Sequence, residues 1–283
     1  MDFCVRAFDP SAMRACANVV IVGKRSTGKT TLCKDLLARA RARMGVWGAA
    51  GGFGDPKNRG LAINATDGYK PEYGRLFEPK RVLANFSDAE AMLAQVVLEQ
   101  KAASATLANM PQGRDPDIEC CVVFDNCIYE AVHAVAGPVR EMFAIGHHIG
   151  IGVTLALSYP LGIPPTMRSE IDYVFVFREP VPSNRRRIYE NYCAAIPGFD
   201  VFCGLLDGLT RGPYECMVVD CTARNPAREL RDYVFYYKAR HVDAIESLAP
   251  FAPAAAVVTA APASASEPLV VTEFNLRKRV RVD

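Results

Sequence analysis

The stretch Gly23-Lys24-Arg25-Ser26-Thr27-Gly28-Lys29-Thr30 decides the fold of this chain. It fits the pattern G-x-x-x-x-G-K-[ST] without deviation. A β-branched run at residues 19–22 precedes it and predicts a strand. The spacing of Leu32, Leu36 and Leu37 after it predicts a helix over residues 29–43. A strand, a glycine-containing loop and a helix form the context in which this motif binds phosphate, so the pattern indicates a P-loop.

Each residue type in the loop has a chemical reason. The glycines let the loop curl so that successive N–H groups point at phosphate oxygens, and the helix N-terminus adds a favourable partial charge. Lys29 is expected to reach the β- and γ-phosphates, and the Thr30 hydroxyl to ligate Mg²⁺. The sequence therefore predicts a site for ATP and Mg²⁺, with nucleotide-binding residues Gly23, Lys24, Arg25, Ser26, Thr27, Gly28, Lys29, Thr30 and Thr31.

A P-loop needs a second acidic group for its metal ion, usually at the end of a neighbouring buried strand. Residues 120–124 form a continuous apolar run of strand length that ends in Asp125. Such runs are typical of strands buried on both faces of a sheet. We therefore predict Asp125 as the Walker B aspartate that holds Mg²⁺ with Thr30. The alternative is an aspartate that merely ends a strand.

From residue 18 onward, β-branched runs alternate with helical stretches, which favours parallel strands joined by crossover helices in an α/β layer architecture. A capping box at residues 87–90 predicts a helix to about residue 103, with Met92, Val96 and Val97 buried. Residues 45–80 lack sustained periodicity, which predicts a strand near Val46 and then a long irregular excursion. Further strands are expected at residues 151–157, 173–177, 215–219 and 233–237, and helices at 139–147 and 184–195.

The excursion mixes aromatic and basic residues. Such a mixture can line a DNA channel, because cations meet phosphates and rings stack on bases, or it can simply anchor a long loop. The residues are Phe53, Tyr69, Tyr73, Phe77, Lys57, Arg59, Lys70 and Arg75. His133 and His241 are interpreted as helix-surface residues rather than as ligands or bases.

The bulk composition is that of a globular protein, with 283 residues, half of them apolar and 23% charged. A net charge of +2 is uninformative about nucleic acid, because affinity for phosphates depends on clustered Lys and Arg. No apolar run approaches the ~20 residues that cross a bilayer, and we find no secretory signal, so an intracellular protein is expected. Ten cysteines without a C-x-x-C pair predict buried, reduced thiols.

Residues 1–246 are predicted to form one P-loop ATPase domain. Beyond them the composition shifts to Ala, Pro, Val and Ser, which cannot bury enough apolar surface to offset the entropy of ordering, so residues 247–283 are predicted to be a flexible tail. The tail ends in a basic cluster that could grip DNA, act as a nuclear-targeting address or keep the chain soluble. The cluster comprises Arg277, Lys278, Arg279 and Arg281.

Five further blocks resemble, in order, those of the DNA-packaging ATPases of poxviruses and giant viruses, which belong to the FtsK-HerA group of P-loop motors. The blocks are residues 125–129, 146–148, 158–165, 172–179 and 183–192. The resemblance spans residues 18–238. It implies a RecA-like P-loop NTPase core, with a mainly parallel sheet flanked by helices.

The resemblance also implies a function. The chain would form a homo-oligomeric ring, hydrolyse ATP between subunits and drive viral double-stranded DNA into a capsid. Its partners would be capsid or portal components, in the host cytoplasm, a viral factory, the virion or the nucleus. An arginine from one subunit would reach the neighbour's γ-phosphate. Arg178 is the first candidate, followed by Arg185, Arg186 and Arg187, for which a solvated helix start or a DNA contact is the alternative.

The sequence departs from the family at three places. Asn126 stands where an acidic residue usually activates the attacking water, and an amide cannot accept that proton. Ser158 replaces a glutamine that senses the γ-phosphate, although its hydroxyl can still donate. Gly146-His147-His148 replaces Gly-Arg-His. Glu130, about one turn beyond Asn126, is a candidate substitute base, with a surface helix glutamate as the alternative.

Two other functions therefore stay open. One is a structural or assembly subunit that binds ATP but hydrolyses it weakly. The other is a nucleotide kinase, which would pass the γ-phosphoryl group to a small acceptor. Phosphate release that duplex DNA increases would favour the motor. Tight binding without turnover would favour the structural subunit, and acceptor-dependent ADP formation would favour the kinase.

Overall fold

The computed structural model describes residues 3–44, 60–64, 72–74, 76–84, 89–108, 119–127, 136–160, 163–222, 229–242 and 270–271. Within these residues a nine-stranded sheet has the order β2-β10-β9-β8-β3-β7-β6-β4-β5. Its strands are β2 (Arg6–Ala7), β3 (Asn18–Val22), β4 (Gly60–Asn64), β5 (Val82–Leu83), β6 (Cys120–Asp125), β7 (Ile151–Leu157), β8 (Tyr173–Phe177), β9 (Glu215–Asp220) and β10 (Val234–Lys238). Separately, β1 (Phe3–Cys4) pairs antiparallel with β11 (Val270–Val271).

The run of strands from β8 to β5 is parallel throughout, as the alternating sequence predicts. The expectation of a mainly parallel sheet is thus confirmed, and the exception in the nine-stranded sheet is β9, which runs antiparallel to both β8 and β10. Two helices, α6 (Pro182–Tyr192) and α7 (Phe199–Leu209), lie between β8 and β9. The second helix was not predicted. A pair of helices returns the chain to the edge it left, so β9 starts where β8 ends.

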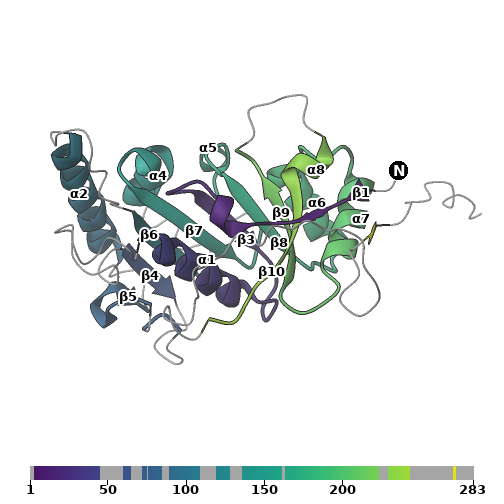
Figure 1. Cartoon of the computed structure of the whole chain (residues 1–283), viewed down its shortest axis with the longest axis horizontal. Coiled ribbons are helices and arrows are strands. Elements are labelled where there is room, and N and C mark those ends of the chain that lie inside the picture. The colour runs from purple at the N-terminus through teal and green to yellow at the C-terminus, as the bar shows by residue number, and fades with distance from the viewer. Residues whose placement is uncertain are drawn as a thin grey trace, which may run out of the picture.

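Helices cover both faces of the sheet. α1 (Lys29–Met44) packs on one face, and the other face carries α2 (Ala89–Ala108), α4 (Ala136–Ile145), α5 (Pro165–Arg168), α6, α7 and α8 (Leu230–Tyr233). Figure 1 shows α1 lying across the sheet, with α2 at one end of the molecule and α7 towards the other. Short 3₁₀ turns complete the helical part: η1 (Pro10–Ala12), η3 (Pro79–Arg81) and η4 (Gly146–His148).

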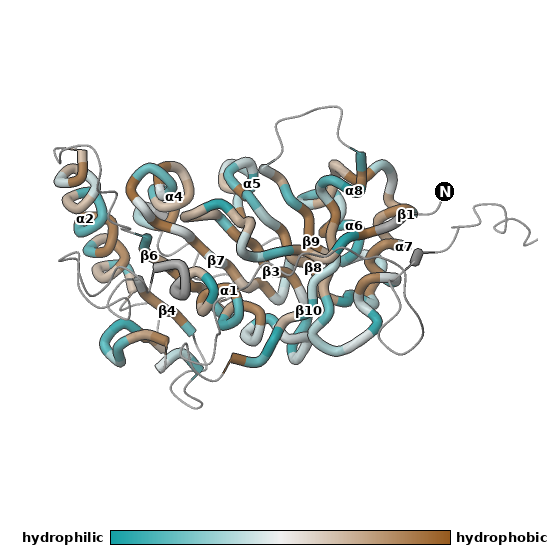
Figure 2. Tube along the Cα trace, in the orientation of Figure 1, coloured by the Kyte–Doolittle hydropathy of each residue, from teal (hydrophilic) through white to brown (hydrophobic). Residues whose placement is uncertain are grey.

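Successive residues of the central strands belong to two separate cores. Val20 and Val22 of β3 contact the helices on the α4 side, whereas Val19 and Ile21 pack with Leu32 and other residues on the α1 side. This follows from the alternation of side chains along a strand, and it explains why these strands are apolar at every position. In Figure 2 the central strands are accordingly coloured as mainly hydrophobic.

The region predicted as one irregular excursion contains a strand. β4 is fully buried between β6 and β5, and Gly60 at its start has a φ of 110°. A Cβ there would lie 2.0 Å from the carbonyl oxygen of Cys121, so the tight pairing with β6 requires glycine. The short sequence GLAIN contains a single β-branched residue, Ile63, and the pattern therefore missed it. The strand predicted near Val46 lies outside the described residues.

Other expectations need smaller corrections. In α2, Val96 and Val97 are buried as predicted, but Leu93 occupies the core where Met92 was expected, and Met92 only packs against it. The predicted helix 184–195 is α6, which begins and ends earlier. The cysteines whose side chains the structure describes are free thiols, as predicted. Burial is confirmed for Cys33, Cys120, Cys127, Cys193 and Cys216, whereas Cys16, Cys121 and Cys203 are half-buried and Cys221 is exposed. No helix among the described residues combines the length and apolar character needed to cross a membrane.

Candidate functional site

Those predicted site residues that the structure describes gather at one edge of the sheet, where four adjacent parallel strands end. β8 is followed by Arg178, β3 by the loop 23–30, β7 by Ser158, and β6 ends in Asp125. The carboxyl ends of parallel strands meet at the same edge, so the strand order alone places these groups side by side. β7 separates β3 from β6, and therefore Ser158 follows the strand that lies between the loop and Asp125.

The loop from Gly23 to Thr30 curls tightly between β3 and α1. Ser26 and Gly28 have φ angles of 63° and 109°. The Gly23 amide donates to the carbonyl of Leu157 at 3.1 Å, and the Thr27 hydroxyl donates to the carbonyl of Lys24 at 2.8 Å. A Cβ at Gly23 would lie 2.7 Å from both Phe177 Cβ and Thr27 Oγ1, so this position has no room for a side chain. The backbone has the curled form that a phosphate-binding loop requires.

Lys29 folds back over its own loop. Its side chain is buried, and its Nζ donates to the carbonyl oxygens of Gly23 at 2.7 Å and Lys24 at 2.8 Å. Burial lowers the pKa of Lys29, and the negative charge of Asp125 opposes that shift. The ammonium therefore lies inside the loop that is predicted to enclose phosphates, held by carbonyl oxygens that a phosphate can replace as hydrogen-bond acceptor.

Asp125 joins the loop to β6. The Thr30 hydroxyl donates to its Oδ2 at 2.7 Å, and the Tyr73 hydroxyl donates to the same oxygen at 2.9 Å. Asp125 is 1% exposed, and its Oδ1 is buried and makes no hydrogen bond to any described residue. Burial raises the pKa of Asp125, while the hydrogen bonds from Thr30 and Tyr73 oppose the rise.

This set of donors suits a hard cation. A carboxylate and a hydroxyl oxygen are ligands of the type that Mg²⁺ accepts, and one buried carboxylate oxygen is left with no hydrogen bond among the described residues. The predicted metal pair, Thr30 and Asp125, is thus brought into direct contact across β7. A buried carboxylate with an unsatisfied oxygen is costly by itself, and a bound cation would remove that cost.

Tyr73 was missed as a site residue. The sequence grouped it with Phe77 among aromatics that line a channel or anchor a loop. Both side chains are buried on the α1 side of the sheet. Buried rings cannot line a DNA channel, so for these two residues the alternative of anchoring the loop is the one that fits. The other residues of that mixture lie outside the described residues: Phe53, Lys57, Arg59, Tyr69, Lys70 and Arg75. No local pattern relates Tyr73 to Asp125, so sequence reasoning had no signal for their contact.

Glu179 is a second residue that the sequence did not single out. It is 3% exposed, and its Oε1 lies 3.6 Å from the Nζ of Lys24 and accepts the Val181 amide at 2.9 Å. Asn184 Nδ2 donates to Glu179 Oε2 at 3.4 Å. The carboxylate therefore joins the phosphate loop to the start of α6. A buried acid directly after a strand that flanks the loop is the signal that could have identified it.

The four candidate arginines have different surroundings. Arg178 is exposed and makes no hydrogen bond or ion pair within the described part of the chain. Arg185 donates to both carboxylate oxygens of Asp207, at 2.9 and 2.5 Å, and joins α6 to α7. The Arg186 guanidinium lies 4.0 Å from the centre of the Phe199 ring, and that of Arg187 lies 5.6 Å from the Tyr159 ring.

The three positions that depart from the family pattern all lie within the described residues, and Gly146-His147-His148 forms the short turn η4. Asn126 has a φ of 59°, a left-handed conformation that asparagine tolerates better than most residues. The Ser158 Oγ is buried and makes no hydrogen bond to any described residue. Glu130 and His133 lie outside the described residues. The expectation that His241 lies on a helix is wrong. It follows β10 and packs edge-to-face on Tyr214, with ring centres 4.7 Å apart.

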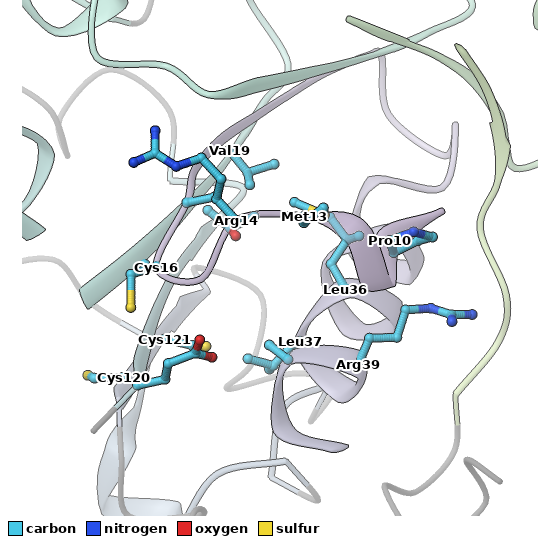
Figure 3. Close-up of a pocket in the computed structure, with 15 residues that line it drawn as sticks. Pro10, Met13, Arg14, Cys16, Val19, Leu36, Leu37, Arg39, Cys120 and Cys121 are labelled. Atoms are coloured by element: carbon cyan, nitrogen blue, oxygen red, sulfur yellow. The ribbon is translucent and has the colours of Figure 1, made fainter. Parts of the chain in front are cut away.

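A pocket on the α1 face lies away from the loop. Figure 3 shows Met13, Arg14, Cys16, Leu36 and Leu37 around it, with Cys121 at its side. Its lining comes from the segment 10–17, from the second half of α1 and from the amino ends of β3, β6 and β7, which lie at the opposite end of the strands from the loop. None of the predicted site residues lines it.

Comparison with known proteins adds two findings. No family model matches the chain. It is 30% identical over 233 residues to the uncharacterized protein 088R of invertebrate iridescent virus 3, covering 80% of this chain and 78% of that protein.

Two solved structures share the fold. The genome packaging NTPase B204 of Sulfolobus turreted icosahedral virus 2, in complex with ATPγS, matches with a TM-score of 0.50 at 14% identity over 80% of this chain and 98% of that one. The pCW3 conjugation coupling protein TcpA, also with ATPγS, matches with a TM-score of 0.54 at 10% identity, covering 80% of this chain and 61% of that one. At such identities the likeness establishes a P-loop NTPase fold.

Proposed function

We propose that this chain, which belongs to the family of viral proteins that includes 088R, is an ATP-dependent motor that translocates viral double-stranded DNA into a capsid. The observation that supports this most is the contact of Thr30 with Asp125 beside the buried Lys29, at the edge where β3, β7 and β6 end. The shared fold with a genome packaging NTPase supports the same function.

In this proposal the loop binds the triphosphate of ATP. Its backbone N–H groups and the N-terminus of α1 face the phosphates, and Lys29 exchanges the carbonyls of Gly23 and Lys24 for β- and γ-phosphate oxygens. Thr30 and Asp125 would hold Mg²⁺, which when bound neutralises charge on those oxygens. Ser158, placed after the strand between the loop and Asp125, is the group that would donate to the γ-phosphate or to water.

We further propose that hydrolysis occurs between subunits of a ring. Arg178 is exposed beside the loop and makes no hydrogen bond or ion pair within the described residues, so it can reach a neighbouring subunit without giving up such contacts. Arg185 is committed to Asp207 and to the carbonyl of Glu179, a bond of 2.5 Å, and would have to give up internal contacts to do so. The internal hydrogen bonds of Arg185 therefore rank Arg178 ahead of it as the arginine that acts on a neighbouring subunit.

DNA binding in this proposal is electrostatic. A motor that moves along DNA grips phosphates rather than bases, so its affinity falls steeply as salt increases. The sequence is the basis for dividing the chain into an ATPase domain, residues 1–246, and a tail, residues 247–283. It is also the basis for assigning a basic cluster to residues 277–281 of that tail. Capsid or portal components as partners and a place in the host cytoplasm, viral factory, virion or nucleus belong to the same proposal.

A second candidate is an assembly subunit that binds ATP and hydrolyses it weakly. One observation favours it. Asn126 occupies a left-handed backbone position next to Asp125, where an amide is structurally well tolerated and cannot act as a base. The two candidates share one nucleotide site and differ only in turnover.

The deciding experiment measures phosphate release from ATP with and without duplex DNA. Wild-type protein should hydrolyse ATP faster with DNA, and Lys29→Ala should lose both nucleotide binding and turnover. Lys101→Ala removes another lysine, on α2, and serves as the matched control that keeps both. ATP binding without DNA-stimulated turnover would establish the assembly subunit instead, and an absolute requirement for a small acceptor would establish a kinase.

A further inference from the structure

Tyr73 reaches Asp125 from a segment that is far from the phosphate loop in sequence. Its hydroxyl donates to Asp125 Oδ2 at 2.9 Å, and the two residues are 52 positions apart. The ring is 0% exposed, and so its hydroxyl is committed to the interior next to the proposed metal position. Cys33 of α1 also lies against the Tyr73 hydroxyl.

The segment that carries Tyr73 is firmly attached to α1. The Tyr73 carbonyl accepts hydrogen bonds from the amides of Leu76 at 2.8 Å and Phe77 at 2.9 Å, and both of those side chains are buried in the same core. Next to it, Glu72 Oε2 lies 2.6 Å from the Nζ of Lys34, one turn along α1 from Thr30. The position of the phenol is therefore set by packing and by an ion pair.

The two donors on Asp125 have a geometric consequence. A carboxylate can rotate about its Cβ–Cγ bond, but Thr30 and Tyr73 hold the same oxygen from two different segments. The plane of the carboxylate is thereby fixed, and Oδ1 is the oxygen left with no hydrogen bond among the described residues. Thr30 is itself a proposed metal ligand, so Tyr73 is the donor that can hold Asp125 without contacting the metal.

We infer that Tyr73 is a positioning residue, which orients Asp125 so that the site has high affinity for Mg²⁺. This inference rests on the proposed ATP site. Groups that hydrogen-bond to metal ligands keep those ligands in a binding orientation, and their loss costs roughly 10- to 100-fold in metal affinity. Tyr73 acts through Asp125 and touches neither phosphate nor the reacting water.

The test is Tyr73→Phe, which deletes the hydroxyl and keeps the buried ring. Binding of a fluorescent ATP analogue is titrated with Mg²⁺, and the Mg²⁺ concentration at half-saturation should rise about tenfold. Binding of the analogue in the presence of a chelator should be unchanged, because Lys29 and the loop are intact. A purely structural role would weaken both measurements or neither, and would overturn the inference.

Tyr233→Phe is the matched control. Its hydroxyl donates to the carbonyl of Ala195 at 3.0 Å, and its side chain packs against the other core, so the Mg²⁺ midpoint should not move. Equal midpoints in Tyr73→Phe and wild type would overturn the inference and leave the proposed function standing. Absence of analogue binding by the wild type at every Mg²⁺ concentration would overturn both.

A second measurement covers the case in which Tyr73→Phe fails to fold. Fluorotyrosine is placed at position 73, or at position 233 as a reference, in the otherwise unchanged chain. Addition of Mg²⁺ and ATP should shift the ¹⁹F resonance at position 73 and leave that at position 233 in place. A stationary resonance at position 73 under conditions where the nucleotide binds would show that Tyr73 is not coupled to the metal.

Discussion

Tyr214 packs its ring directly on Gly28, the last glycine of the phosphate loop. A Cβ at Gly28 would lie 2.7 Å from Tyr214 Cδ1 and 3.4 Å from Tyr214 Cα, and the φ of Gly28 is 109°. Tyr214 itself has a φ of 63° and comes immediately before β9, whose first residues pair with the end of β8. Because β9 runs antiparallel to β8, its first residues lie beside the end of β8, and the ring of Tyr214 therefore packs against the phosphate loop.

Gly28→Ala should therefore abolish nucleotide binding. The added methyl group collides with Tyr214, and the backbone must leave a conformation that costs about 1–2 kcal/mol for residues with a Cβ. The loop amides would then lose their common orientation towards the phosphates. Isothermal titration with ATP and Mg²⁺ checks this, with thermal unfolding to confirm that the variant folds.

Gly198→Ala is the control for the backbone strain. Gly198 has a similar φ of 101°, and a Cβ there meets nothing within 4 Å. This variant should lose about 1–3 kcal/mol of unfolding free energy and keep its affinity for ATP. Equal ATP affinities in the two glycine variants would show that the contact with Tyr214 does not matter to the loop.

Arg178→Ala should lower ATP turnover by about 10³-fold while ATP affinity stays near that of wild type. The reason is that an arginine that reaches into the site of a neighbouring subunit stabilises the negative charge that develops on the phosphoryl group in the transition state, so its loss slows hydrolysis more than it weakens ATP binding. Arg186→Ala, which removes a guanidinium stacked on Phe199, should leave turnover nearly unchanged. Steady-state phosphate release measured beside ATP binding separates the two effects.

Mixing two inactive variants tests whether Arg178 acts between subunits. Arg178→Ala supplies intact Lys29, and Lys29→Ala supplies intact Arg178, so mixed rings contain some complete sites. Partial recovery of turnover on mixing is expected. A mixture as inactive as its components would place the arginine's role within one subunit or outside catalysis.

Glu130→Gln should reduce turnover by about 10²-fold or more if Glu130 replaces the base missing at Asn126. ATP binding should be retained, because the substitution is isosteric and lies outside the phosphate loop. Unchanged turnover eliminates Glu130. Asn126→Asp is the complementary variant: aspartate tolerates the left-handed φ of 59° and restores a carboxylate, so turnover should increase.

Asp125→Asn should stabilise the metal-free protein at neutral pH. Burial raises the pKa of Asp125 above its ordinary value of 3.8. At pH values between the ordinary pKa and the raised pKa of the folded state, the folded state binds a proton that the unfolded state has released. The free energy of unfolding therefore falls as pH rises from the ordinary pKa through the raised one. Above the raised pKa the loss is complete, and the variant, which carries no charge there, avoids it.

The stabilisation should appear as a higher Tm for the variant than for the wild type at neutral pH. Thermal unfolding in chelator from acid to neutral pH measures it. The difference between variant and wild type should shrink towards acid pH, where Asp125 is protonated in both states. A variant that is less stable than wild type at neutral pH would contradict this account.

Several parts of the site could be predicted because the residues that form them are neighbours in the sequence. The strand before Gly23, the curled loop and the helix from Lys29 follow one another along the chain, and β6 ends in Asp125 as its apolar run indicates. Parallel strands then bring Thr30 and Asp125 to one edge. The assignment of roles to these residues remains a prediction that the experiments above address.

The sequence by itself determined most of the buried strands, β4 excepted, and the strand-loop-helix unit that we propose binds phosphate, because side-chain periodicity, β-branching and glycine content act over a few neighbouring residues. Only the tertiary structure decided that Tyr73 holds Asp125, that Glu179 faces Lys24, that β9 enters antiparallel with Tyr214 against Gly28, and that Arg185 is committed to Asp207. These contacts join residues far apart in the chain. They depend on the order of strands and the paths of helices between them, which no local propensity specifies.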